Sequence, residues 1–90
     1  MEIIEIWRTC EDFFESSKPK KTIDVQGTNF VVPADIKYVC VEPTRPKMGV
    51  LQGFQKKPEF HGHWKRGKEV AVVIACIIFE GDASQWLIEV

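Results

Sequence analysis

The residues best suited to chemistry lie in one stretch, residues 56–68, with the sequence KKPEFHGHWKRGK. It holds cations, both histidines and two aromatic rings, and its glycines and proline are typical of a loop. Loops carry binding and catalytic residues more often than the elements they connect. With two further cations upstream, the candidate partner-binding residues are Arg45, Lys47, Lys56, Lys57, Phe60, His61, His63, Trp64, Lys65, Arg66 and Lys68.

The first interpretation of this stretch is a docking site for an acidic protein surface. Trp64, Phe60 and Arg66 are of the types that dominate many protein interfaces. Charge is segregated along the chain, since residues 43–68 carry seven Lys or Arg against one acid, whereas residues 1–17 carry five acids and one Arg. This pattern is typical of an adaptor, an inhibitor or a complex subunit. The basic loop could also pair with the acidic N-terminal segment of a second copy in a homodimer.

The second interpretation is single-stranded nucleic-acid binding by the same loop. Its cations would neutralise phosphates while bases stack on Phe60 and Trp64, each stacked base contributing on the order of 1–3 kcal/mol. The net charge of −1 and the acidic ends of the chain argue against a dedicated nucleic-acid binder. We therefore keep it as the alternative to a protein partner.

A third interpretation is a metal or acid–base site at the two histidines. On an extended strand His61 and His63 would point to the same side and could share one Zn²⁺, with Glu59 or a distant cysteine as a further ligand. The sequence has no C-x-x-C or H-E-x-x-H motif, phosphate-binding loop, dinucleotide-binding glycine motif or nucleophile elbow. We therefore expect no cofactor and no enzymatic activity, and a small enzyme or metal site centred on these histidines is the remaining alternative.

Composition bounds the class of protein. The chain has 90 residues, 44% of them hydrophobic, which suits a single domain over residues 1–90 with one core. Cys10, Cys40 and Cys76 are odd in number and far apart, so we expect free thiols and a cytoplasmic location rather than a disulfide framework. The longest apolar run, residues 70–79, is about half as long as a membrane-spanning helix, so we expect no membrane partner.

That apolar run organises the predicted fold. Six of its ten residues are β-branched, which favours a strand over a helix. A strand without polar alternation must be covered on both faces, so we place it centrally in a sheet. It begins a predicted C-terminal hairpin over residues 69–90, with a turn at residues 81–84 and a second strand on which Trp86, Ile88 and Val90 point inward.

Residues 1–17 are predicted to form an amphipathic helix. Apolar residues at positions 3, 6, 7, 10, 13 and 14 fall on one side of a helical wheel, and charged residues fall on the other. Such a stripe usually packs on a core. We therefore assign Trp7, Phe13 and Phe14 to the interior, beneath a helix that lies across a sheet.

Between these ends the chain alternates strands and turns. We predict a hairpin over residues 21–32, strands at 36–42 and 48–55, and the basic aromatic loop at 56–68. Gly49 and Gly53 share one face of their strand, which indicates a bulge, a strong twist or a close approach by another group. The predicted fold class is α+β, with one N-terminal helix packed on a mostly antiparallel sheet of five to six strands, either open or a partly closed barrel.

Overall fold

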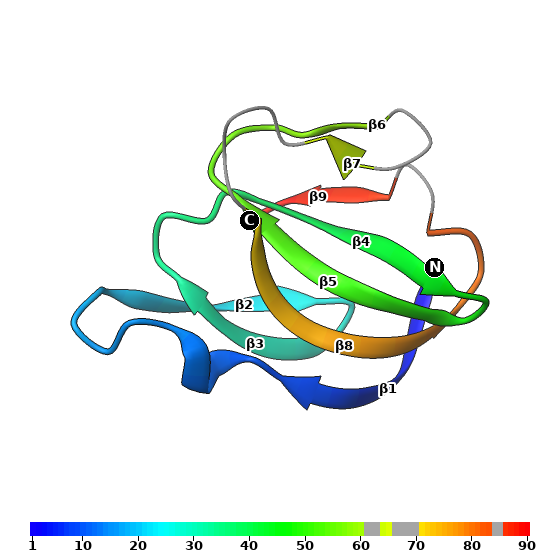
Figure 1. Ribbon diagram of the computed structural model, residues 1–90, viewed down its shortest axis with the longest axis horizontal. Helices are drawn as coiled ribbons and strands as arrows, with labels where there is room; N and C mark the ends of the chain where they lie inside the picture. Colours follow the sequence, from blue (N-terminus) through cyan, green and yellow to red (C-terminus); the bar gives the residue numbers. More distant parts are fainter. Residues whose placement is uncertain (61–63, 66–70, 84–85) are drawn as a thin grey trace.

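The computed structural model describes residues 1–60, 64–65, 71–83 and 86–90 (Figure 1). Its elements are β1 (Glu2–Thr9), the 3₁₀ helix η1 (Glu11–Phe13), β2 (Lys20–Val25), β3 (Thr28–Pro33), β4 (Tyr38–Arg45), β5 (Met48–Phe54), β6 (Glu59–Phe60), β7 (Trp64–Lys65), β8 (Val72–Glu80) and β9 (Leu87–Glu89). Five strands form one antiparallel sheet in the order β1-β8-β5-β4-β9. The pairs β2–β3 and β6–β7 are separate two-stranded sheets.

The predicted N-terminal helix is wrong, and with it the α+β class, because the first residues form the edge strand β1. Against β8, the register of β1 skips Ile4 and then Trp7, so each of these residues is a β-bulge. A bulge adds one residue to the two-residue period of a strand. As a result Ile3, Ile6 and Thr9 all lie opposite buried residues of β8. A three-residue apolar repeat resembles a helical stripe, which is why the pattern predicts a helix.

The main core lies between the β2–β3 hairpin and one face of the five-stranded sheet (Figure 1). Its buried side chains include Ile23, Val25, Phe30 and Val32 from the hairpin and Val39, Val41, Leu51, Ile74, Ala75, Ile77 and Phe79 from the sheet. Cys40 and Phe54 form a smaller buried cluster. Because Cys40 alternates with two core residues along β4, this second cluster lies on the opposite face of the sheet. The hairpin, rather than a helix, therefore covers the main core.

The predicted close approach to Gly49 and Gly53 is present on the core face of β5. A Cβ atom at Gly49 would lie 2.7 Å from Cγ1 of Val41, and one at Gly53 would lie 2.8 Å from Cγ2 of Ile36. Both distances are below 3.0 Å, which is closer than Cβ atoms approach other atoms in proteins. The two glycines therefore let neighbouring side chains fill the core against the backbone of β5.

The predicted C-terminal hairpin is also wrong, because β9 pairs with β4 and not with β8. Both edges of β8 are already occupied, by β1 and β5, so the last strand adds to the free edge of β4. Ile88 lies opposite Val39 there, and the Val90 N–H donates to the Lys37 carbonyl oxygen at 2.8 Å. β9 pairs with Tyr38, Val39 and Cys40 of β4, so among the described strands the remainder of β4 is an edge, where a proline such as Pro43 is tolerated.

Candidate functional site

The structure does not bring all of the predicted cations together. Arg45 and Lys47 are exposed where β4 turns into β5, whereas Lys56 and Lys57 are exposed beyond the far end of β5. β5 has seven residues, so the strand separates the two pairs by about 20 Å. The upstream pair and the first two lysines of the loop are therefore separate features of the surface.

The predicted loop contains a short strand pair. Phe60 lies opposite Trp64, and Glu59 lies opposite Lys65, in the β6–β7 ladder. The other predicted residues of the loop, His61, His63, Arg66 and Lys68, lie outside the described residues. In the part of the chain that the structure describes, no group of three or more His, Cys, Asp or Glu side chains could hold a metal ion.

A different surface stands out because large apolar side chains are exposed on it. Trp7 is 61% exposed, Ile4 is 52% exposed and Phe13 is 70% exposed. Ile6, also on β1, is exposed as well. We call Ile4, Ile6, Trp7 and Phe13 the β1 surface. The helical-wheel pattern assigns most of these residues to a core, so sequence reasoning missed this surface.

The two bulges explain the exposure of Ile4 and Trp7. Each is the extra residue at a bulge and has no partner residue on β8. Bulges re-aim the side chains that they carry. Sequence does hold one signal for this arrangement, since two adjacent apolar pairs, residues 3–4 and 6–7, are each followed by a charged residue. Ile and Trp are strand-forming types, and repeated apolar pairs of this kind fit a bulged strand.

The outer edge of β1 is covered only at its start in the described part of the chain. The Gln26 side chain donates from Nε2 to the Met1 carbonyl oxygen at 2.7 Å, and its Oε1 accepts from the Ile3 N–H at 3.3 Å. One side-chain amide thus bonds β1 as the backbone of a neighbouring strand would. Gln26 reaches this position from the turn between β2 and β3, where its φ is +53°. Further along, β8 is the one strand that pairs with β1 among the described strands.

Arg8 joins β1 to the 3₁₀ helix that follows it. Its guanidinium carbon lies 4.9 Å from the centre of the Phe13 ring, which is a cation–π distance. Near this point the Cys10 N–H donates to the Ile74 carbonyl oxygen at 2.9 Å and fixes the end of β1 against β8. The exposed ring of Phe13 is therefore held in a defined place next to the strand.

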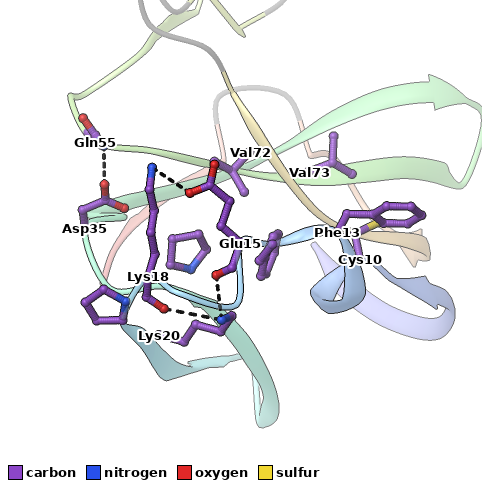
Figure 2. A pocket seen from close by; sticks show the side chains of 12 residues that line it. Cys10, Phe13, Glu15, Lys18, Lys20, Asp35, Gln55, Val72 and Val73 are labelled. Carbon is purple, nitrogen blue, oxygen red and sulfur yellow. Dashed lines mark hydrogen bonds and ion pairs between the residues drawn. The ribbon is translucent and has the colours of Figure 1, made fainter.

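A cavity of about 440 Å³ lies beside Phe13 (Figure 2). The residues that line it are Cys10, Phe13, Phe14, Glu15, Lys18, Pro19, Lys20, Pro33, Asp35, Gln55, Val72 and Val73. Lys18 and Glu15 form an ion pair, with Lys18 Nζ 3.5 Å from Glu15 Oε2, and Lys20 Nζ donates to the Glu15 backbone carbonyl oxygen at 3.0 Å. Gln55 donates to the Asp35 carboxylate. The remaining lining is mostly apolar, so the cavity suits an apolar group better than an ion.

Cys40 does not have the properties of a nucleophile. Burial, with a smaller contribution from the Glu42 carboxylate, raises the pKa of the Cys40 thiol to about 12. A thiol must lose its proton to react, so this one stays inert near neutral pH. Cys10 is also buried, whereas Cys76 is half-buried.

Comparisons of this chain with protein-family models, with curated proteins and with solved structures gave no match. Among the described residues, no helix has the length and apolar character needed to cross a membrane.

Proposed function

We propose that this chain is a small interaction protein without enzymatic activity, and that it binds another polypeptide with the β1 surface. The observation that carries the proposal is the exposure of Trp7 on a bulge of an edge strand. Exposed apolar patches on small domains usually mark binding sites, and Trp is the type most enriched among residues that dominate interface energy. Ile4 and Phe13 extend the apolar area on either side of it in the sequence.

A polypeptide suits this surface better than a small molecule because β1 offers backbone groups as well as side chains. An extended segment added to an open strand edge gains main-chain hydrogen bonds, and pockets beside the edge select its side chains. Gln26 already supplies such bonds to Met1 and Ile3. The apolar cavity beside Phe13 is large enough to receive a bulky side chain of the partner.

Docking of an acidic protein by residues 56–68 is the second proposal, and it is supported by the exposed side chains of Lys56 and Lys57. Single-stranded nucleic acid is the alternative ligand for those cations. Both ligands would depend on charge, whereas the β1 surface would depend on apolar contact. Substitutions on the two surfaces therefore separate the proposals.

The test is quantitative capture from an extract of the cells that make this protein, after nuclease treatment. The immobilised wild-type chain is compared with Trp7→Ala and with the double variant Lys56→Ala, Lys57→Ala. We expect a captured protein that the lysine variant retains and that Trp7→Ala reduces at least tenfold, because one exposed Trp anchor contributes about 2 kcal/mol or more to binding. Capture that falls with the lysine variant and not with Trp7→Ala would contradict the β1 proposal and favour the basic loop.

A further inference from the structure

We infer that the β1 surface binds a second copy of this chain, with the two β1 strands antiparallel about a two-fold axis between Ile6 and Trp7. The inference rests on the proposed function, since it names the partner of the same surface. The inference follows from the order of charges along β1, from the part of its outer edge that no described strand covers and from the form of the opposite edge of the sheet.

The charges of β1 complement themselves in this register. Glu5 lies opposite Arg8 of the second copy, and Arg8 lies opposite Glu5 of the second copy. Ile6 and Trp7 lie beside the two-fold axis. Opposite charges are a favourable cross-strand combination, and no like charges face each other in this register.

The two charged residues also lie on the same face of β1. Glu5 pairs with Ile78 and Arg8 pairs with Cys76, and both partners alternate along β8 with the core residue Ile77. Glu5 and Arg8 therefore point away from the main core. Since directly opposed residues of antiparallel strands share a face, each charge can reach its counterpart on the outer face of the joined sheet.

The register uses the part of the β1 edge that none of the described strands covers. Residues 4–9 pair with residues 9–4 of the second copy, and the Gln26 amide keeps its bonds to Met1 and Ile3. Edge strands that avoid pairing commonly carry lysine or proline, and β1 carries neither. Its exposed side chains include Ile4 and Trp7, which would be sheltered in the pair.

Association by this edge closes at two copies. In a two-fold dimer the β1 edge of each copy pairs with the β1 edge of the other, so neither is available to a third copy. The opposite edge of the five-stranded sheet is formed by β9, which has only three residues, and by the part of β4 beyond it, where Pro43 has no N–H to donate. Very short edge strands offer little to a further copy. We therefore expect dimers rather than filaments.

The experiment is sedimentation velocity over a range of concentrations, with Glu5→Arg and Arg8→Glu studied alone and mixed. Each variant alone opposes like charges at both symmetric contacts, so we expect its dissociation constant to rise about tenfold or more. In the equimolar mixture, a heterodimer sets two positive charges on one β1 strand against two negative charges on the other, which restores the wild-type affinity. Glu89→Arg, which changes an exposed acid on β9, is the matched control and leaves self-association unchanged.

Two outcomes would overturn the inference: a wild-type chain that stays monomeric up to about 1 mM, or single variants that dimerise as well as the wild type. Arg8→Glu also removes the contact with Phe13, and restored dimerisation in the mixture excludes that loss as the cause of weakening. Thermal unfolding of each variant checks that it is folded. If the wild type is monomeric while Trp7→Ala still abolishes capture of another protein, the inference fails and the proposed function stands. If Trp7→Ala reduces neither self-association nor the capture of another protein, both the inference and the proposed function fail.

Discussion

The guanidinium carbon of Arg8 lies 4.9 Å from the centre of the Phe13 ring, so the end of β1 and the 3₁₀ helix after it present one continuous surface. At an exposed site such a contact contributes about 0.5–1 kcal/mol. That is enough to hold a ring in place without burying it. Phe13 is thereby positioned at the cavity that it lines, where a partner could reach both.

Truncation of Phe13 or Trp7 should hardly affect stability. We expect Phe13→Ala and Trp7→Ala to lower the free energy of unfolding by about 1 kcal/mol or less, because both side chains are exposed. Chemical denaturation measures this, and Leu51→Ala is the control, since loss of that fully buried side chain should remove about 2–5 kcal/mol. A loss of several kcal/mol at position 7 or 13 would mean that these rings are buried, as a helical stripe predicts.

Gly53 should not tolerate a side chain. A Cβ there would lie 2.8 Å from Cγ2 of Ile36, so we expect Gly53→Ala to destabilise the fold by about 1–3 kcal/mol through overpacking. The comparison is Gly27→Ala, which meets no atom within 4 Å and is opposed only by its φ of +88°. Denaturation midpoints distinguish the two mechanisms, because Gly27→Asn, which tolerates a positive φ, should recover stability at the turn. An unchanged midpoint for Gly53→Ala would contradict the packing of β5.

Cys40 should make the fold sensitive to alkaline pH. Its pKa rises from an ordinary value of 9.0 to about 12 in the folded chain, so between these values the unfolded thiol loses its proton while the folded one keeps it. The free energy of unfolding is therefore fully retained below pH 9 and falls as pH rises above it. Denaturation from pH 7 to pH 10, with Cys40→Ala as the control, should show a steeper decline for the wild type. If the free energy of unfolding fell equally steeply with pH in both proteins, the raised pKa of Cys40 would not be the cause. Alkylation of Cys40 in the folded chain as fast as that of the half-buried Cys76 would also contradict it.

Gln26 should protect the start of β1. We expect Gln26→Ala to speed hydrogen exchange of the Ile3 N–H, because its acceptor is the Gln26 side chain. Gln26→Gly is the matched variant, since it also removes the amide but relieves the positive φ at this position. Both substitutions should expose the Ile3 N–H to exchange, but only Gln26→Gly should leave the turn between β2 and β3 without strain. Exchange at Ile3 that is unaffected by either change would contradict the capping role.

Much of the strand pattern could be predicted from local sequence. Alternating apolar residues on both sides of Gly27 predict a hairpin over residues 21–32. The strands β2 and β3 lie close to that predicted range. The β-branched run at residues 70–79 indicates a strand, and β8 occupies most of it. Such segments are predictable because the two-residue period and the turn residues are local properties.

The N-terminal strand and the sheet order could not be predicted in the same way. Two bulges give β1 a three-residue repeat, and only its pairing with β8 distinguishes this from a helix. The partner of β9 depends on which strand edges remain free after β1 and β5 have paired with β8. The exposure of Trp7 follows from the same long-range pairing, which is why composition drew attention to residues 56–68 and not to β1. The role of those residues stays a prediction.

Photo-crosslinking from the β1 surface tests whether a polypeptide binds there. A benzophenone amino acid is placed at Ile4, and in separate chains at Thr22 and at Lys57, which are exposed positions on β2 and in the basic loop. Illumination in an extract of the producing cells, followed by mass spectrometry, identifies the crosslinked polypeptide. We expect crosslinks from position 4, to a second copy or to another protein, and none from position 22. Crosslinks from position 57 alone, or from no position, would contradict binding by the β1 surface.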